Sequence, residues 1–397
     1  MPIIGERLRE LRKPRFTQHD LAAAADVSVD VIRKLEQGRR HTASIGTLQR
    51  IARALDVDVA ELLGRARAAP ATDTDEDEPL VSAIRDALTS VDELLGELDD
   101  SDAPDLAELE RAVSYAWGAF WAGRYGLLAA LSPRLLTDAA AAVHGAAASE
   151  AGRAVDLAAQ VHQLTAHALL HHGANDLGHV AAREALRLAA LAPDPLRAAA
   201  GRWTLSYVLL RQGRFIDAER VCVATAEGMR PTGDASPAHL TVYGGVLLRG
   251  ASAAARQGRA GAAGGLISEA TETARRTGAD RTDYDVPFGS GHVTMQAADC
   301  AVVAEDYVTA AKVARKMPPD SALSLAYRSR HLVDVAHAQL RLGHAKAAES
   351  ALLTMERAAP EWTAHQRLPR VLVGELMTQG RPSTRLRELA HRLNTTR

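Results

Sequence analysis

A turn signature that recurs six times constrains the fold of this chain more than any other feature of its sequence. In each copy a glycine or polar turn precedes an aromatic or aliphatic residue and then small residues, as in RQGRFIDAE at Arg211. The equivalent turn positions, 38 to 50 residues apart, are Gly123, Gly173, Gly213, Gly258, Glu305 and Gly343. Such a period, with an amphipathic helix on either side of each turn, predicts stacked helical hairpins, which form an α-solenoid.

The composition favours an all-α fold. Hydrophobic residues make up 47% of the 397 residues but aromatic residues only 4%, so alanine and leucine must fill the cores. Both residue types favour helices. A chain of this length should also hold at least two domains.

A second pattern lies ahead of the repeats, from Thr17 to Arg40. Thr17 can cap one short helix, and Ser28 can cap a second helix that ends before Gly38. The second helix would turn apolar residues inward and leave charged residues such as Lys34 facing outward. In this arrangement a recognition helix enters the major groove of DNA. The alternative is a small helical bundle whose exposed charges are only solvated.

Residues 4–63, IGERLRELRKPRFTQHDLAAAADVSVDVIRKLEQGRR followed by LQRIARALDVDVAELL, resemble the Cro/C1-type (XRE-family) helix-turn-helix domain. The resemblance implies a five-helix module, with helices near residues 5–12, 18–24, 29–37, 45–55 and 59–63. It also implies an ion pair between Arg12 and Glu36 that holds the fold together.

The resemblance and the outward helix face together give the residues that we expect to contact DNA. Gln18 would brace the recognition helix and touch phosphate, while Val31 would meet a thymine methyl group. Arg39 and Arg40 would follow the phosphate backbone. The full set is Gln18, Ser28, Val29, Asp30, Val31, Arg33, Lys34, Arg39 and Arg40.

Charge separates a basic head from an acidic body. Residues 1–67 hold 13 lysines and arginines against 9 aspartates and glutamates, whereas the whole chain has a net charge of −2. Five acidic residues between Asp73 and Glu78 form a tether that cannot fold by itself. We therefore expect a DNA-binding domain over residues 1–67, an acidic linker over 68–80, and a solenoid for sensing and dimerisation over 81–397.

The helical hairpins resemble degenerate tetratricopeptide repeats, with Leu205 and Gly213 among the matching positions. Residues 111–397 also resemble the C-terminal region of actinobacterial regulators that carry the same N-terminal domain. That resemblance rests on segments such as WGAFWAGRYGLLAALSPRLL, YGGVLLRGASAAARQGRAGAA and FGSGHVTMQ. In the last segment His292 and Gln296 stand where the family has Asn and His, which implies changed chemistry at a ligand contact.

In stacked hairpins the first helix of each pair lines the concave face, where a ligand can bind. The residues expected there mix aromatic and hydrogen-bonding groups, as a peptide or small-molecule site requires. They are His167, Trp203, Tyr207, Ser252, His292, Met295, Gln296, Asp299, Arg330 and His337. The alternative is that large side chains such as Trp203 and Met295 only pack between repeats.

The sequence thus predicts a sequence-specific transcriptional regulator, a homodimer on a pseudo-palindromic double-stranded DNA operator, that senses a small molecule or peptide. In the alternative interpretation the solenoid is a protein–protein docking scaffold without a small ligand. The sequence has no catalytic constellation, metal-ligand set or cofactor motif, its two cysteines lack CxxC spacing, and no apolar run reaches membrane-spanning length. We expect a cytoplasmic protein that is not an enzyme.

Overall fold

The computed structural model describes residues 4–13, 15–37, 43, 45–55, 57, 77–95, 97, 104–379 and 382–394. Within these ranges the regular structure is helical apart from one pair of short strands, which confirms the all-α class. The chain divides into two compact units, with helices α1–α4 in the smaller and helices α6–α22 in the larger. The predicted helix at 59–63 and residues 68–76 of the predicted linker lie outside the described residues.

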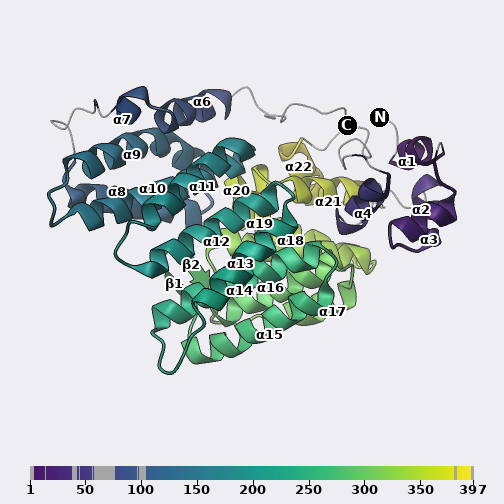
Figure 1. Ribbon diagram of the computed structural model, residues 1–397. Coiled ribbons are helices and arrows are strands. Elements are labelled where there is room, and N and C mark those ends of the chain that lie inside the picture. The colour runs from purple at the N-terminus through teal and green to yellow at the C-terminus, as the bar shows by residue number, and fades with distance from the viewer. Residues whose placement is uncertain are drawn as a thin grey trace. The chain divides into compact units, whose positions relative to one another are not determined.

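The smaller unit has helices at the positions that the helix-turn-helix resemblance implies (Figure 1). They are α1 (Ile4–Arg12), α2 (Gln18–Ala24), α3 (Val29–Glu36) and α4 (Ile45–Leu55). Helix α3 packs against α1 and α2, and α2 packs against α4. Their common core buries leucine, isoleucine and alanine side chains. Ile32 and Leu35 of α3 belong to this core, as the sequence predicts.

The larger unit is built mainly from six helical hairpins that follow one another along residues 106–358 (Figure 1). The paired helices are α8 (Leu106–Trp121) with α9 (Tyr125–Gly145), α10 (Ala151–His171) with α11 (Asn175–Ala189), α12 (Pro195–Arg211) with α13 (Phe215–Gly228), α14 (Pro237–Arg256) with α15 (Ala260–Thr277), α16 (Ser290–Val303) with α17 (Tyr307–Ala314), and α18 (Leu325–Arg341) with α19 (Ala345–Ala358). Successive hairpins also pack together, as α10 does against α9 and α12 against α11. This is the predicted solenoid of helical hairpins.

The six turn positions identified in the sequence all adopt the left-handed backbone conformation. The five glycines have φ angles between 74° and 81°, and Glu305, the exception, has a φ of 60°. Glycine adopts this conformation without the steric cost that a Cβ atom imposes. Turn geometry therefore explains why glycine recurs at this spacing.

Further helices cover both ends of the solenoid. Helix α6 (Asp77–Leu88) packs against α9 and is followed by α7 (Val91–Leu95). Helix α6 begins inside the predicted linker, because acidic residues and a proline in the first turn favour a helix start. At the other end lie α20 (Pro360–Ala364), α21 (Arg367–Thr378) and α22 (Thr384–Arg392). Helix α22 packs against α19 and α21 and so covers the last hairpin.

The first and last hairpins of the larger unit lie against each other. Helix α18 contacts α8, and α20 lies at the turn between α8 and α9. There Trp362 packs against Gly123, and the Glu361 carboxylate accepts a hydrogen bond from the backbone N–H of Gly126 at 3.3 Å. One hydrophobic core accordingly joins α6 and α8–α12 to α18–α22.

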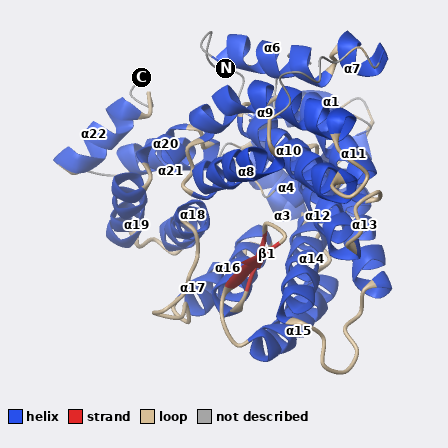
Figure 2. Ribbon diagram, turned by 90° about the vertical axis from the view of Figure 1, so that its left-hand side faces the viewer, coloured by secondary structure: helices blue, strands red, loops and turns tan. Residues whose placement is uncertain are grey.

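A short antiparallel β-hairpin interrupts the repeats between α15 and α16 (Figure 2). Strand β1 (Arg281–Asp283) pairs with β2 (Val286–Phe288), the red segment in that figure. Phe288 presses against α14 at Gly244, where an added Cβ atom would lie 2.1 Å from the ring. The YGGV and FGSG segments of the sequence therefore contact each other.

The turn of this β-hairpin is held by polar groups of α10, of α12 and of the residue that caps α12. Tyr284 and Asp285 have φ angles of 53° and 63°, although such turns usually contain Asn and Gly. The Tyr284 hydroxyl donates to Asp194, and Asp285 pairs with Arg197, which also holds Asp156. Burial raises the pKa of Asp285 to about 6, although Arg197 opposes this shift. Tertiary contacts thus fix a turn that the local sequence does not predict.

Helix α9 corrects one expectation from the sequence. By length and composition it is apolar enough to cross a membrane, because alanine and leucine dominate its 21 residues. Helix α9 packs against α6, α8 and α10, and 44% of its most apolar 18-residue window is buried. Core helices meet the same test of length and composition.

Candidate nucleic-acid interface and ligand site

Helix α3 is positioned by the turn that precedes it. Thr17 caps α2 as predicted and forms a capping box with Asp20, with reciprocal hydrogen bonds of 3.2 and 3.0 Å between side chain and backbone. Asp26 then reverses the chain with a φ of 50°. Ser28 occupies the N-cap position of α3, but its side chain makes no capping hydrogen bond. The turn, rather than a side-chain cap, therefore sets where α3 begins.

A buried network ties α3 to α1 and α2. Glu36 accepts two hydrogen bonds from the Arg12 guanidinium, at 2.6 and 3.0 Å, and a third from the Gln18 amide at 2.7 Å. Burial alone would raise the pKa of Glu36, but the hydrogen bonds from Arg12 and Gln18 outweigh it and lower that pKa. The expected ion pair is formed, and Gln18 connects the start of α2 to the end of α3.

The outward face of α3 carries three charged side chains that are each about half exposed. Lys34 Nζ lies 2.7 Å from Asp30 Oδ2, and Arg33 lies 3.9 Å from Asp30 Oδ1. The hydrogen bond from Lys34 lowers the pKa of Asp30. Exposed pairs of this kind are weak and are screened by salt. Either cation can therefore leave Asp30 for a phosphate or a base edge at little cost.

The other residues expected to contact DNA surround this face only in part. Ser28 is exposed, whereas Val29 and Val31 are half-buried and pack against the core of the smaller unit. Arg39 and Arg40 lie outside the described residues. The described outward surface thus contains polar groups and the accessible edges of two valines.

The first helices of the hairpins form one side of the larger unit, which we call the inner face. There, aromatic rings from the first helices of four hairpins meet. The aromatic cluster consists of Trp117, Phe120 and Trp121 on α8, His167 on α10, Trp203 and Tyr207 on α12, and Tyr327 on α18. The His167 ring centroid lies 4.7 Å from that of Phe120, 5.6 Å from Tyr207 and 5.9 Å from Trp203. Trp121 stacks on Tyr327 with centroids 5.8 Å apart. Three predicted ligand residues are therefore neighbours in one cluster.

Two members of the aromatic cluster bury polar atoms without hydrogen-bond partners. His167 is 1% exposed and Trp117 is 4% exposed. Neither ring nitrogen of His167 nor the indole N–H of Trp117 is bonded within the described chain. Burial and the charge of Arg249 lower the pKa of His167 to about 3, so its imidazole is neutral at physiological pH. Because buried polar groups are normally paired, these atoms mark a place where a polar ligand atom would be stabilised.

Sequence reasoning did not select Arg249 of α14, which lies over two rings of the aromatic cluster. Its guanidinium Cζ is 4.5 Å from the Trp203 ring centroid and 4.6 Å from that of Tyr207. Arg249 precedes the predicted residue Ser252 by three positions, so helical spacing could have found it. Phe120, Trp121 and Tyr327 were also missed, because the spacing of turns does not show how the first and last hairpins meet.

A polar group lies on α16 and α18. Arg330 donates to Asp299 at 2.7 Å and lies 3.4 Å from Asp334, while Gln296 donates to Asp299 at 2.8 Å. The negative charge of Asp334, and to a smaller extent that of Asp299, raises the pKa of Arg330 above its ordinary value, although burial acts in the opposite direction. Three more predicted ligand residues are therefore brought together, and Asp334 joins them as a partner that the sequence did not indicate.

The remaining predicted ligand residues have different surroundings. His292 is 3% exposed and lies at the edge of the aromatic cluster, where its ring centroid is 5.3 Å from that of Tyr327. Burial lowers the pKa of His292 to about 4. Ser252 and Met295 are buried, and His337 contacts Arg341, with their nitrogens 3.3 Å apart.

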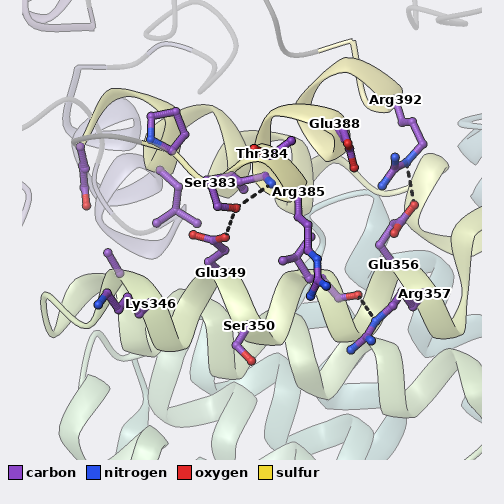
Figure 3. Close-up of a pocket in the computed structure, with 16 residues that line it drawn as sticks. Lys346, Glu349, Ser350, Glu356, Arg357, Ser383, Thr384, Arg385, Glu388 and Arg392 are labelled. Atoms are coloured by element: carbon purple, nitrogen blue, oxygen red, sulfur yellow. Dashed lines mark hydrogen bonds and ion pairs between the residues drawn. The ribbon is translucent and has the colours of Figure 1, made fainter.

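A separate recess of about 1070 Å³ lies between α19 and α22 (Figure 3). Its acidic groups attach the last helix, since Ser383 donates to Glu349 and Arg392 pairs with Glu356 at 2.8 Å. Within the described chain its lining shares no residue with the predicted ligand set. The recess therefore lies where α22 packs against α19, and it is not part of the inner face.

Comparison with known proteins decides the nature of the smaller unit. Residues 3–63 match a family model described as a helix-turn-helix domain. The smaller unit is a helix-turn-helix domain. No curated protein matches the chain significantly.

Among solved structures, the chain is similar to the crystal structure of Bacillus thuringiensis PlcR in complex with the peptide PapR7 and DNA. The sequence identity is 10% and the TM-score 0.33, with 79% of this chain and 94% of that chain covered. A similarity of this extent does not assign that protein's partners to this chain.

The two sites offer different chemistry. The helix-turn-helix domain presents exposed charges that can meet phosphates and base edges. The inner face presents aromatic area with a few polar groups. Among the described residues no group of three or more His, Cys, Asp or Glu side chains could hold a metal ion.

Proposed function

We propose that this protein is a ligand-responsive transcriptional regulator that reads double-stranded DNA with α3. The observation that carries this proposal is the arrangement of α3 on its domain. Ile32 and Leu35 anchor the helix, while Asp30, Arg33 and Lys34 remain exposed and exchangeable. A helix held in this way can place its N-terminal half in the major groove.

The regulator would act as a homodimer. One helix-turn-helix domain has only a modest excess of positive charge, with 13 lysines and arginines against 9 acidic residues, so a single copy would bind weakly at physiological salt. Two copies related by a two-fold axis would read a pseudo-palindromic operator whose half-sites lie about one helical turn apart.

The inner face of the solenoid would sense a small molecule or a peptide. The aromatic cluster supports this part of the proposal because it combines ring surface with the unpartnered nitrogens of His167 and Trp117. An effector bound there would change DNA affinity by the difference in its binding to the two arrangements of the dimer.

Selection from random DNA duplexes tests the DNA-reading half. The full-length protein at near-physiological salt should enrich a palindromic motif, and the variant Arg33→Ala with Lys34→Ala should not. Arg220→Ala is the matched control, because Arg220 also pairs with an aspartate three residues away but lies on α13. If no motif is enriched, or if the double variant enriches the same motif, α3 does not read DNA.

The sensing half needs a second measurement. Affinity for the enriched duplex should change when extracts of small molecules and peptides from the native host are added. This change should be lost in the Trp203→Ala variant, which removes one ring of the aromatic cluster. If no fraction of these extracts changes the DNA affinity, and a protein co-purifies with the chain, the solenoid is a docking scaffold instead.

A further inference from the structure

Arg249 is a cation on the inner face that has no acidic partner among the described residues. Its guanidinium lies over the rings of Trp203 and Tyr207 and hydrogen-bonds with the side chain of Tyr327. Its Nε atom is buried and has no hydrogen-bond partner in the part of the chain that the structure describes. Within the described chain no carboxylate forms an ion pair with it.

Three other arginines of the inner helices contrast with Arg249 because each is neutralised by carboxylates. The pairs are Arg330 with Asp299 and Asp334, Arg197 with Asp156 and Asp285, and Arg341 with Glu375. A partly buried charge is unfavourable unless it is paired. Arg249 therefore lacks the kind of partner that these arginines have.

The surroundings of Arg249 narrow what that partner can be. The aromatic cluster offers flat ring surfaces from α8, α10, α12 and α18. A neutral imidazole such as that of His167 has one donor and one acceptor nitrogen, and the Trp117 indole has one donor. These atoms are uncharged, so they can bond a neutral polar atom of a ligand and leave its charge to Arg249.

We propose that the inner face binds an anionic ligand with a flat aromatic body, whose carboxylate pairs with Arg249 while its body packs in the aromatic cluster. This inference rests on the proposed sensing function and names the chemical class of the effector. The planar guanidinium fork matches a carboxylate in bidentate geometry. Offset stacking on the Trp and Tyr rings holds the body. A cationic ligand is opposed by the positive charge of Arg249.

A matched pair of probes separates the charge from the aromatic body. The compounds are 1-naphthylacetate and 1-naphthylacetamide, which share the ring system and differ in charge. Intrinsic fluorescence reports on the site directly, because three of the four tryptophans, Trp117, Trp121 and Trp203, belong to the aromatic cluster. The acid should change the fluorescence saturably and bind about tenfold or more tightly than the amide, the ratio expected for charge-assisted hydrogen bonds.

Variants of Arg249 assign that ratio to one side chain. Arg249→Met should make the two probes bind alike, and Arg249→Lys should keep a smaller preference for the acid. Arg202→Met, which removes an exposed arginine of α12, should leave the ratio unchanged. If Arg249→Met does not fold by circular dichroism, Arg249→Lys alone decides, since the loss of the planar fork must lower the ratio.

The proposal is overturned if neither probe binds, if both bind the parent protein equally, or if the ratio survives in Arg249→Lys. These titrations contain no DNA, so their failure is distinct from failure of the proposed function. Acid-selective binding without any effect of 1-naphthylacetate on operator affinity would uphold the site and count against sensing. If operator affinity responds to other extract fractions but the protein does not prefer the acid, the sensing function is upheld and the proposed anionic site is rejected.

Discussion

The outward face of α3 and the inner face of the solenoid treat polar groups in opposite ways. On α3, Asp30, Arg33 and Lys34 are about half exposed, and among the described residues their ion pairs are only with one another. On the inner face, His167 and Trp117 are buried, and their ring nitrogens have no hydrogen-bond partner in the described chain. Exposed pairs can be exchanged at little cost, whereas a buried unpaired group carries its full desolvation penalty. The first surface therefore suits many weak contacts, and the second suits one complementary ligand.

The largest expected effect comes from the network beneath α3. Glu36→Ala should destabilise the helix-turn-helix domain by about 3 to 5 kcal/mol, because it leaves the buried Arg12 charge without its partner. Hydrogen exchange resolved along the full-length chain should show early opening of α1–α3, with the solenoid unchanged. Asp30→Ala, on the exposed face of the same helix, should have little effect on this exchange. Equal opening in both variants would remove the distinction between the two faces of α3.

Asp285, in the turn of the β-hairpin, should make the stability of the protein depend on pH. Burial raises the pKa of Asp285 from 3.8 to about 6, so between these values the folded protein holds a proton that the unfolded chain has released. The contribution of Asp285 to stability is therefore present below about pH 4 and lost as the pH rises through 6. Asp285→Asn should remove this loss and gain about 1 to 3 kcal/mol relative to the parent protein between pH 4 and 7.5.

Urea unfolding at pH 4 and 7.5 measures this difference. Asp283→Asn is the control from the same β-hairpin, because the hydrogen bond from Arg281 lowers the pKa of Asp283. Its carboxylate stabilises the folded state at the higher pH, so its removal should act in the opposite direction. The same sign for both variants would contradict the assigned environment of Asp285.

A substitution at the centre of the aromatic cluster tests the cost of its unpaired polar atoms. His167→Phe should stabilise the ligand-free protein by about 1 to 3 kcal/mol, because it removes two buried nitrogens without partners and keeps a flat ring. Thermal unfolding in the absence of ligand measures the gain. His162→Phe is the comparison, since the His162 ring bonds the backbone oxygen of Ala158 at 2.9 Å and its loss should not stabilise. A destabilised His167→Phe variant would mean that this imidazole is satisfied.

On the exposed face the expected effect is on DNA binding and not on stability. Lys34→Ala should weaken binding to the selected operator by about 1 to 3 kcal/mol if Lys34 reads a guanine, with relaxed preference at that position. If it meets only phosphate, the loss should be equal on all sequences and the salt slope should fall by about one. Fluorescence anisotropy over a series of salt concentrations, on operator and scrambled duplexes, separates these outcomes. No change on either duplex would place Lys34 away from the interface.

Much of the smaller unit follows from local sequence. The ends of α2 and α4 agree with those that the family resemblance implies, and those of α1 and α3 differ by one residue. For α2 and α3 the local sequence points to the same helices, because a capping residue and the spacing of apolar side chains act within one or two turns of helix. The outward position of Asp30, Arg33 and Lys34 follows from the inward position of Ile32 and Leu35 on the same helix.

The inner face was only partly predictable. Counting back from the turns selected His167, Trp203 and Tyr207, which do lie together. It could not select Tyr327, whose stacking on Trp121 depends on the curvature that brings the last hairpin against the first. Curvature accumulates from small rotations between hairpins, and no single segment of sequence specifies it.

By itself, the sequence determined the helices, the six turns and the helix-turn-helix domain, because glycine conformation, capping and helical periodicity are local properties. In the solenoid, only the tertiary structure decided which polar groups are paired. Arg330 lies among carboxylates and Arg249 among aromatic rings, although both are arginines on first helices of hairpins. The reason is physical, since the cost of a charge depends on its neighbours in space, which come from helices far apart in the chain.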